Sequence, residues 1–568
     1  MPATTPAPTP GATITPDQDH ARAPTHGAGT GTGPNTGLDA GTTAGATTGP
    51  NTRQGIGTAT GTVAGADTEP GAGTTAATTT GLNTQPGAGT SARTTTGPGS
   101  ELGIGATTGA AIGTNTASNT PTTTGATTGP DNGPRTGRDT GTGTTTGQGT
   151  ETDQAPIGVA IIGAGERGVY YVGSRMAELA AETGFRIVSV HDRLPERARL
   201  AAAHLDALYA GAGVGHTVGV APDLTAAVTD PAVQMVLVTT HTNAHLEPVR
   251  AAVRAGKRVY LDKPISVSLA DARAIVAAEA EGGAPIMMGF TRRYERPWID
   301  AIALSRTGAT GTPRMVLLRS VIPYTRYLQL WHRTNAASGG AINDKGSHHF
   351  DVLNWVAGPG ARAVSVTAMG GRSSIFAPDP DAPARCSECD RACPYRRHET
   401  LIDVAEGVGR VPNDSWLDAT DPADRNDNCV YLPGSDIDDH AVVTVQYDSG
   451  LVACLFFTIF GPYAEDQETL EIIGESGRLR MERHSGEIDL VSGHGAERRV
   501  IPAGADNRDS SHFGADLELV RTMRRFIAGE APPAGVRDGL ASLELVEAAR
   551  RSMAANGRAV DPRNQEFL

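Results

Sequence analysis

Three short segments of this chain carry side chains that could do chemistry together. They are Gly163-Ala-Gly-Glu-Arg-Gly168, Leu261-Asp-Lys-Pro264 and Asp344-Lys-Gly-Ser-His348. Oxidation of a secondary alcohol needs a base for the O–H proton while the C–H hydride leaves for a nicotinamide. Histidine titrates near neutrality, so His348 is the candidate base. Lys263 can hydrogen-bond the reacting oxygen and stabilise an alkoxide, and Asp344 can hold a hydroxyl or the imidazole.

The first segment has the setting of a dinucleotide-binding loop. An apolar run, Val159–Ile162, precedes it, and a stretch with helical spacing begins at Val169. In a strand–turn–helix, the glycines of G-x-G-x-x-G allow a tight turn and the close approach of a pyrophosphate to backbone N–H groups. The loop residues expected to contact the cofactor are Gly163, Gly165, Arg167 and Gly168. An ordinary glycine turn is the alternative.

An acidic residue follows at the end of the next predicted strand. Asp192 can accept hydrogen bonds from both hydroxyls of the adenosine ribose and would repel a 2′-phosphate, so NAD is the expected cofactor. Arg193 beside it could instead pair with that phosphate, which leaves NADP as the alternative.

The chain joins two polymers of different composition. Residues 1–154 are mainly Gly, Thr, Ala and Pro, and they include no Phe, Trp, Tyr, Lys or Cys. Such a segment has almost nothing to bury against the entropy of ordering, so we expect a disordered tail. A flexible tether or an O-glycosylated stalk is the functional interpretation. The plain one is a dispensable tail, or upstream codons counted in error as part of the gene.

The net charge of residues 155–568 limits the classes of partner that we expect this protein to bind. The formal net charge is −14, and the tail holds ten acidic residues and five Arg, so −9 remains for 155–568. An acidic body without a Lys/Arg cluster argues against nucleic acid or an anionic membrane surface as partner. No signal-peptide core is present, and no apolar run approaches the roughly 18 residues of a membrane span. We expect a cytoplasmic protein.

Strand-like and helix-like runs alternate from Pro156 to about Gly283, which predicts a doubly wound parallel sheet. The strand candidates are Ile157–Ile162, Ile187–Val190, Met235–Val238 and Arg258–Leu261, and the helical stretches include Pro195–Leu208 and Leu246–Ala255. A ligand should bind at the carboxyl ends of these strands. The glycine loop, Asp192, Thr239–His245 and Asp262-Lys-Pro264 all fall there.

Beyond Pro285 the pattern favours a larger, mainly antiparallel open sheet. The strand candidates are Met315–Ser320, Ala363–Ala368, His440–Tyr447, Leu451–Phe457 and Leu470–Ile473, and a last helix spans Gly539–Ala555. We therefore expect a disordered tail over 1–154, a Rossmann domain over 155–284, and a C-terminal α/β domain for substrate and oligomerisation over 285–568.

Four motifs in this order resemble the Gfo/Idh/MocA oxidoreductase family, which includes glucose–fructose oxidoreductase and inositol dehydrogenases. They are Gly163–Gly168, Thr240-His-Thr-Asn-Ala-His245, Ala255-Gly-Lys-Arg-Val-Tyr-Leu-Asp-Lys-Pro264 and Gly339-Gly-Ala-Ile-Asn-Asp-Lys-Gly-Ser-His-His-Phe-Asp351. The resemblance covers about Pro156 to the C-terminus. It implies a Rossmann domain followed by an α/β domain whose open sheet often supports oligomerisation.

The resemblance also implies roles for single residues. Lys263, Asp344 and His348 would form the catalytic set, and Thr240, Asn243, His245, Asp262 and Lys263 would lie beside the cofactor. A helix-capping role is the alternative for Asn243. The family usually has Glu at the position of Asp262, and the shorter acid could alter how Lys263 is held.

These observations predict an NAD-dependent dehydrogenase or reductase of a sugar, inositol or related polyol. Two alternatives stay open: an enzyme that keeps NAD bound and cleaves a glycosidic bond through transient oxidation, and a sensing protein without turnover. Arg292, Arg293, Tyr294 and His512 are further candidates for substrate contact, with a solvated surface turn as the plain interpretation of the first three.

Four of the five cysteines lie in a polar insertion of about 376–433. Cys386, Cys389 and Cys393 give C-x₂-C-x₃-C-P, and Cys429 follows. Four thiolates can bind Zn²⁺ tetrahedrally, and an insertion with little apolar content needs such a cross-link to be stable. An iron–sulfur cluster, disulfides and unligated thiols are the alternatives. Cys454 lies in an apolar strand and is expected in the core.

Overall fold

The computed structural model describes residues 93–96, 100–103, 155–396, 427–462, 464, 466–504 and 511–568. The chain divides into two units, Met1–Asp139 and Thr140–Leu568. In the first unit, β1 (Arg93–Thr96) and β2 (Ser100–Gly103) pair antiparallel. The rest of the predicted tail lies outside the described residues.

A six-stranded sheet follows, with the strand order β5-β4-β3-β6-β7-β8 and parallel pairing throughout. Its strands are β3 (Ile157–Ile162), β4 (Phe185–His191), β5 (Gly219–Val220), β6 (Met235–Val238), β7 (Arg258–Leu261) and β8 (Ile286–Met288). β3, β6 and β8 are buried along their whole length, which explains their continuous apolar sequences. The order reverses between β3 and β6, so a ligand crevice is expected at their carboxyl ends.

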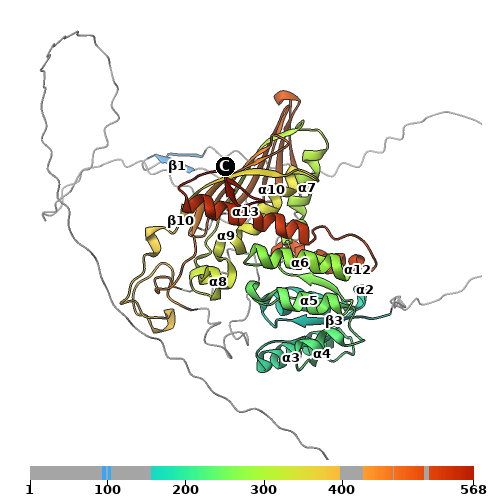
Figure 1. Cartoon of the computed structure of the whole chain (residues 1–568). Coiled ribbons are helices and arrows are strands. Elements are labelled where there is room, and N and C mark those ends of the chain that lie inside the picture. Colours follow the sequence, from blue (N-terminus) through green and yellow to red (C-terminus); the bar gives the residue numbers. More distant parts are fainter. Residues whose placement is uncertain are drawn as a thin grey trace, which may run out of the picture. The chain divides into compact units, whose positions relative to one another are not determined.

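Helices connect these strands and cover both faces of the sheet (Figure 1). They are η1 (Arg167–Gly173), α1 (Ser174–Glu178), α2 (Ala180–Thr183), α3 (Pro195–Gly211), α4 (Leu224–Thr229), α5 (Leu246–Arg254) and α6 (Leu269–Gly282). The start of α6 is set by Ser268, whose hydroxyl accepts a hydrogen bond from the N–H of Asp271. Its end is set by Gly283, which has a φ of 65° that favours glycine.

The second sheet has ten strands in the order β16-β15-β14-β13-β9-β12-β11-β10-β17-β18. The strands are β9 (Pro313–Val321), β10 (Ala363–Gly371), β11 (His440–Tyr447), β12 (Val452–Thr458), β13 (Glu468–Gly474), β14 (Arg478–Glu482), β15 (Glu487–Ser492), β16 (Glu497–Pro502), β17 (Val560–Asp561) and β18 (Glu566–Phe567). All neighbours pair antiparallel except β12 and β9, which are parallel. The predicted large, mainly antiparallel sheet is confirmed.

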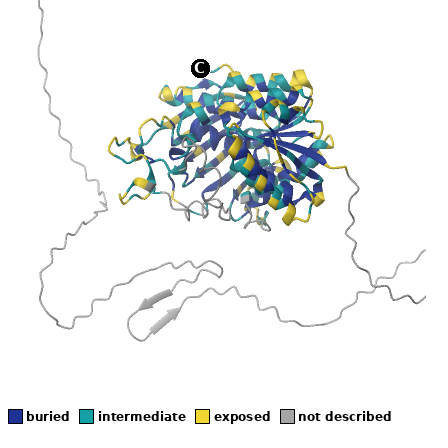
Figure 2. Cartoon of the chain, turned by 90° about the horizontal axis from the view of Figure 1, so that it is seen from below, coloured by how far each residue is buried: buried dark blue, intermediate teal, exposed yellow. Residues whose placement is uncertain are grey.

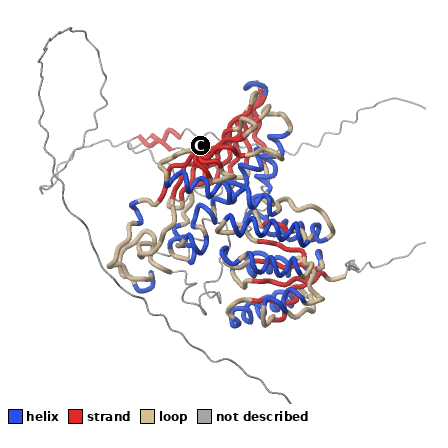
Figure 3. The backbone as a smooth tube through the Cα atoms, in the orientation of Figure 1, coloured by secondary structure: helices blue, strands red, loops and turns tan. Residues whose placement is uncertain are grey.

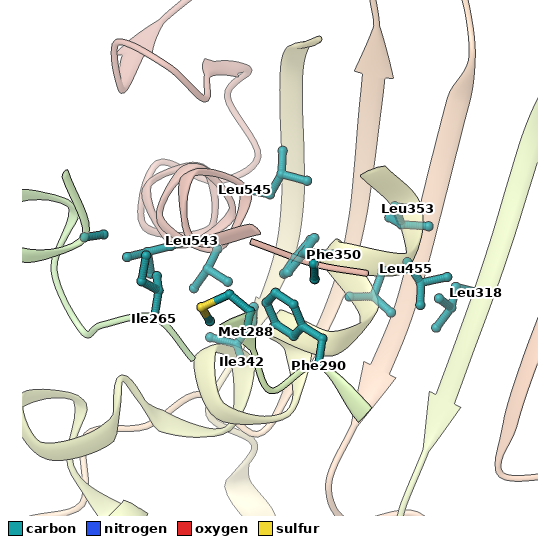
Figure 4. Close-up of a cluster of buried hydrophobic side chains, with 14 of the residues drawn as sticks. Ile265, Met288, Phe290, Leu318, Ile342, Phe350, Leu353, Leu455, Leu543 and Leu545 are labelled. Atoms are coloured by element: carbon teal, nitrogen blue, oxygen red, sulfur yellow. The ribbon is translucent and has the colours of Figure 1, made fainter. Parts of the chain in front are cut away.

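Helices pack on one face of this sheet. They include α7 (Arg296–Arg306), α9 (Gly340–Asp344), α10 (Gly346–Ala357) and α13 (Val536–Ala554). In Figure 1, α13 lies between the large sheet and α6, and Figure 3 shows the two sheets as separate layers with helices between them. The side chains that fill this space include Phe290, Phe350 and Leu543, which gather with Leu318 and Leu455 of the sheet in Figure 4.

The opposite face of the large sheet carries exposed apolar side chains. Along β9, Val316 and Leu318 are buried whereas Met315 and Leu317 are exposed. Phe456 of β12 is 45% exposed and pairs across the sheet with Val442 of β11, which is 42% exposed. The expectation that Cys454 is a core residue is wrong, because it is only partly buried and pairs with Leu317 on this uncovered face.

A late segment returns to the first sheet. The buried face of α12 (Ala515–Ile527) joins the hydrophobic cluster that contains Val159 and Ile161 of β3. Figure 2 shows how the helices enclose the buried strands. None of the helices in the described part of the chain is long and apolar enough to span a bilayer.

Candidate active site

The loop after β3 has three glycines with three different surroundings. Gly163 has a φ of 98°, and a Cβ there would lie 2.7 Å from the carbonyl oxygen of Thr239. A Cβ at Gly168 would collide with the side chain of Thr239. At Gly165 nothing lies within 4 Å of the Cβ position, so this side of the loop is open. A tight turn, an open approach and close helix packing are what a dinucleotide pyrophosphate requires of such a loop.

Asp192 supports this loop from the end of β4. One carboxylate oxygen accepts a hydrogen bond from the N–H of Ala164 at 2.9 Å, and the other accepts one from the N–H of Leu194 at 2.9 Å. Arg197 lies 3.8 Å from the carboxylate, and Arg193 is exposed next to it. Asp192 and Arg193 thus both follow β4, next to the glycine loop.

Arg167 of the same loop is held by protein carboxylates. Its guanidinium lies 2.6 Å from Asp516 and 3.3 Å from Asp262, and it donates to the hydroxyl of Tyr260 at 3.1 Å. His512 lies 2.8 Å from the second oxygen of Asp516. Burial alone would raise the pKa of Asp516, but His512 and Arg167 hold that pKa far below its ordinary value. Asp262 thus faces Arg167, and His512 belongs to the surroundings of the glycine loop.

The segment after β6 contributes one buried and one exposed polar side chain. The ring nitrogens of His245 lie 3.2 Å from the carbonyl oxygens of Ile265 and Thr240, and burial lowers the pKa of the imidazole. His245 therefore holds two strand-end turns together. Asn243 is exposed in the turn η2 (Thr242–Ala244). No side chain caps α5 at its N-cap residue, His245.

Lys263 and Asp344, which the sequence assigns to one catalytic set, form an ion pair. The Lys263 ammonium lies 3.2 Å from a carboxylate oxygen of Asp344 and donates to its backbone carbonyl at 3.0 Å. The peptide bond between Lys263 and Pro264 is cis. Burial opposes ionisation of Asp344, but Lys263 and His332 outweigh it and lower the pKa of the carboxyl to about 2. The Asp344 carboxyl is therefore ionised at neutral pH.

His348 lies in the first turn of α10 and is buried. Burial, followed by the charges of Lys263 and Arg292, holds the pKa of its imidazole well below its ordinary value. Its Nδ1 atom has no hydrogen-bond partner among the described residues. The rings of His348 and Phe290 are arranged edge to face, with 6.0 Å between the ring centroids. A neutral imidazole in this position can accept a proton.

Two residues that contact Asp344 were not anticipated from the sequence. The hydroxyl of Tyr327 donates to the Asp344 carboxylate at 2.6 Å, and Nε2 of His332 lies 3.9 Å from the other carboxylate oxygen. Trp331 stacks on His241 with ring centroids 4.0 Å apart. A signal was present, because Tyr324 to His332 concentrates aromatic and imidazole rings in a chain with only 4% aromatic residues.

Comparison with known proteins agrees with this arrangement. Residues 157–290 match the family described as "Oxidoreductase family, NAD-binding Rossmann fold", and residues 306–561 match its C-terminal α/β domain. The chain belongs to the Gfo/Idh/MocA oxidoreductase family. NAD(P) is therefore its cofactor class, and the open side of the glycine loop fits it.

Among relatives of this Gfo/Idh/MocA protein are two inositol 2-dehydrogenases. The one from Streptomyces avermitilis is 31% identical over 229 residues, which are 39% of this chain and 59% of that protein. The one from Pseudomonas fluorescens is 34% identical over 179 residues, 30% of this chain and 47% of that protein. The matched segments thus span about half the length of these relatives.

Solved structures share the fold at low identity. An oxidoreductase from Agrobacterium radiobacter in complex with NAD⁺, L-tartaric acid and magnesium has a TM-score of 0.52 and 18% identity, with 72% of this chain and 100% of that chain covered. An oxidoreductase domain protein from Kribbella flavida has a TM-score of 0.54 and 21% identity, with 72% and 99% covered.

In this Gfo/Idh/MocA protein, the segment after β8 does not offer the expected substrate contacts. Arg292 is 1% exposed and pairs with Glu295 and Glu468. Arg293 binds Asp351 through two hydrogen bonds of 2.9 Å. The hydroxyl of Tyr294 donates to the carbonyl of Met288 at 3.3 Å. The interpretation as a solvated surface turn is equally wrong, because distant carboxylates fold onto these arginines.

The four cysteines of the insertion line one cavity of about 350 Å³. The N–H groups of Cys386 and Cys429 donate to the carbonyls of Asp427 and Ala384 at 2.7 and 2.9 Å, which joins the two ends of the insertion. All five cysteines are free thiols, and burial raises the pKa of Cys429. Among the described residues, no three His, Cys, Asp or Glu side chains are arranged to hold a metal ion. Residues 397–426 of the insertion lie outside the described residues.

Proposed function

We propose that this chain is an NAD-dependent dehydrogenase or reductase that transfers a hydride between the nicotinamide and a secondary alcohol or ketone of a sugar, inositol or related polyol. The observation that carries the proposal is the Lys263–Asp344 ion pair beside a buried, neutral His348. Lys263 follows β7 at the carboxyl ends of the parallel strands, where the cofactor crevice of this fold lies, and α9 and α10 carry Asp344 and His348. The inositol 2-dehydrogenases among its relatives support the substrate class.

Three side chains would each have a separate role in the reaction. The bound nicotinamide supplies the hydride acceptor or donor. Neutral His348 takes the hydroxyl proton of the alcohol, and Lys263 donates a hydrogen bond to the same oxygen as negative charge develops on it. Asp344 holds the ammonium of Lys263 in place. The hydroxyl of Tyr327 fixes the Asp344 carboxylate in turn.

The cofactor side of the proposal assigns contacts to the glycine loop and the strand ends. Gly163, Gly165 and Gly168 would admit the pyrophosphate, and Asp192 would accept from the ribose hydroxyls. The carboxylate of Asp192 supports NAD over NADP, because it would repel a 2′-phosphate. Thr240, Asn243 and His245 would border the nicotinamide side.

A screen of polyols and glycosides tests this function against its alternatives. Mixing the protein with NAD and each compound should produce NADH absorbance with at least one inositol or sugar. Glycoside cleavage without net NADH would instead identify the enzyme that oxidises its substrate only transiently. Tight NAD binding without turnover of any compound would identify a sensing protein.

The uncovered face of the large sheet supports a homo-oligomer within this proposal. Met315, Leu317, Val442 and Phe456 form an exposed apolar surface on neighbouring strands, and an uncovered sheet face of this kind marks an interaction site. Light scattering should give at least a dimer. Phe456→Glu should lower that mass, because a charge would be buried at the interface.

The proposal also includes a structural zinc ion held by Cys386, Cys389, Cys393 and Cys429. Its support is the spacing of the cysteines and their position around one cavity, and binding would have to draw the four thiols together. About one zinc per chain by elemental analysis would support the zinc site, whereas iron with labile sulfide would indicate an iron–sulfur cluster instead.

Free thiols and a net charge of −9 over 155–568 support a cytoplasmic protein without a nucleic-acid or membrane partner.

A further inference from the structure

Residues His512 to Asp516 come back from the C-terminal domain to the glycine loop, and we call them the return segment. Asp516, in the first turn of α12, is 2% exposed, and its carboxylate lies 2.6 Å from the guanidinium of Arg167. The two residues are 349 positions apart in the chain. The second carboxylate oxygen lies 2.8 Å from Nδ1 of His512. A buried ion pair therefore joins the glycine loop to the part of the chain that matches the second family domain.

The guanidinium of Arg167 also contacts the end of β7. It donates to the hydroxyl of Tyr260 at 3.1 and 3.3 Å, and its Nε atom lies 3.3 Å from the carboxylate of Asp262. The Tyr260 hydroxyl donates to the same carboxylate at 3.1 Å. All three guanidinium nitrogens thus contact protein oxygen atoms. Arg167 connects the glycine loop, the end of β7 and the start of α12.

The backbone of the return segment has an uncommon conformation. His512 and Phe513 have φ values of 48° and 51°, and Gly514 follows with 82°. The left-handed region is unfavourable for residues other than glycine, above all for a bulky one such as Phe513. Such a conformation persists only where the surrounding contacts impose it. The ring of His512 lies 5.1 Å from that of Tyr171 in η1, whereas the ring of Phe513 lies 4.5 Å from the guanidinium of Arg483.

Both sides of the return segment are firmly held. Arg483, which follows β14, donates to Glu295 at 2.8 Å and to Glu468 at 2.7 Å, and these three side chains are buried. On the other side, α12 packs in the hydrophobic cluster that contains β3. The large sheet therefore fixes Phe513, and the backbone turn at residues 512–514 directs the neighbouring His512 to the glycine loop.

We infer that Asp516 and His512 are positioning residues for the cofactor: His512 orients the Asp516 carboxylate, Asp516 holds Arg167, and Arg167 keeps the glycine loop in the conformation that receives the pyrophosphate. The inference rests on the cofactor contacts of the proposed function. A loop that is already ordered loses less conformational freedom when the dinucleotide binds. The affinity for NAD then depends on residues of the C-terminal domain that do not contact NAD.

A direct contact between Arg167 and the pyrophosphate is the rival interpretation, and it predicts the opposite effect of one substitution. Asp516→Asn keeps the shape of the side chain and removes its charge. If Arg167 neutralised the pyrophosphate, loss of the competing carboxylate would tighten the binding of NAD. If Asp516 positions the loop through Arg167, the Kd of NAD should rise roughly tenfold, the effect of losing a charge-assisted hydrogen bond.

The measurement is a fluorescence titration of the full chain with NAD and with ADP-ribose. Both compounds carry the pyrophosphate, so Asp516→Asn should weaken their binding by the same factor. Glu518→Gln is the matched control, because it removes a carboxylate from the same first turn of α12, where Glu518 pairs with the exposed Arg525 at 2.8 Å. The Kd of NAD should stay within error in this control.

Arg167→Lys separates charge from geometry at the centre of the network. A lysine keeps the positive charge, but a single ammonium cannot reproduce the planar set of contacts to Tyr260, Asp262 and Asp516. This variant should therefore weaken NAD about as much as Asp516→Asn does. A normal Kd of NAD in Arg167→Lys would show that charge alone suffices, and it would overturn the inference.

His512→Asn tests the outermost contact of the network. Asparagine tolerates the left-handed conformation, so the backbone turn is retained while the imidazole is lost. The Kd of NAD should rise roughly threefold, which is less than in Asp516→Asn because Arg167 keeps its carboxylate. An effect as large as that of Asp516→Asn would contradict the order of the network, in which His512 acts only through Asp516.

Kinetics distinguish a positioning role at the cofactor loop from general damage to the site. With a polyol that is turned over, Asp516→Asn should raise the KM of NAD far more than it lowers kcat at saturating NAD. A lowered kcat with an unchanged KM, or unchanged or tighter NAD binding in the folded variant, would overturn the inference. If Asp516→Asn does not fold, Arg167→Lys and His512→Asn decide it.

Failure of the proposed function gives a different result. If NAD binds but no polyol is turned over, the proposed reaction fails, and the Kd values of the variants still decide the inference. If the unaltered chain binds neither NAD nor NADP, the cofactor contacts assigned to the glycine loop are wrong, and the inference falls with them.

Discussion

The parallel and the mixed sheet contribute to the proposed site in different ways. In the parallel sheet, each contributing residue follows a strand directly: the glycine loop follows β3, Asp192 follows β4, and Lys263 follows β7. In the mixed-sheet region, Asp344 and His348 lie on helices packed against the strands, and the side chains that bind Asp344 are Tyr327 and Lys263, 17 and 81 residues away along the chain. A parallel sheet positions ligand-binding residues through topology, whereas the second half of this site depends on side-chain pairs.

The largest effect on kcat is expected when a candidate catalytic residue of either region is replaced. Lys263→Ala and His348→Ala should each lower kcat by roughly 10²-fold or more, because a hydrogen bond to the alkoxide or the general base is lost. His348→Ala should keep the Kd of NAD, since His348 lies outside the glycine loop. Steady-state kinetics and NAD titration check both statements. A near-normal kcat in His348→Ala would leave the chemistry to the parallel-sheet region alone.

A smaller effect is expected at Asp192, which tests the parallel-sheet region by itself. Asp192→Ala removes the acceptor for the ribose hydroxyls and the brace of the glycine loop at Ala164. The Kd of NAD should rise roughly tenfold, and that of NADP should rise less because the repulsion of its phosphate is lost as well. Fluorescence titration with both cofactors measures the two constants. A larger rise in the Kd of NADP than in that of NAD would overturn the choice of NAD as the cofactor.

Sequence reasoning succeeded where local pattern decides structure. The predicted strands Ile157–Ile162, Met235–Val238 and Arg258–Leu261 agree with β3, β6 and β7 at both ends. These strands are buried on both faces, so they are continuous apolar runs bounded by turn residues. Once these strands pair in a parallel sheet, their carboxyl ends lie at one edge, so the residues that follow them come together without long-range side-chain pairing.

It failed where long-range pairing decides structure. β14 and β16 were missed for different reasons: β14 is short, with only Leu479 and Met481 alternating with charged residues, and β16 is largely exposed. Arg292 resembled a surface residue because its partner Glu468 lies 176 residues further along the chain. Such pairs leave no local pattern. The contacts of Tyr327 with Asp344 and of Glu468 with Arg292 are therefore seen only in the folded chain.

Removal of the Tyr327 hydroxyl tests the mixed-sheet region, because this substitution deletes a single oxygen atom. Tyr327→Phe leaves the ring and removes the donor to Asp344, whose net contribution is about 1 kcal/mol. We expect a kcat lowered roughly fivefold, an unchanged Kd of NAD, and a small loss of thermal stability. Tyr324→Phe is the matched control, since the hydroxyl of Tyr324 does not bond to Asp344. An equal loss in both variants would show that Tyr327 acts through packing only.

The smallest effect is expected from removing the tail, which tests whether the two sheets alone build the site. Every residue assigned here to cofactor or substrate lies beyond Pro156, and residues 1–154 hold no aromatic side chain that could join either core. A chain that begins at Thr152 should therefore keep the thermal midpoint, the Kd of NAD and the kcat of the full chain within error. A chain that begins at Ala164 lacks β3, the strand between β4 and β6, and should not fold, which gives the assay its negative control. Loss of NAD binding on removal of residues 1–151 would mean that the tail completes the cofactor crevice. The site would then need a third region besides the parallel and the mixed sheet.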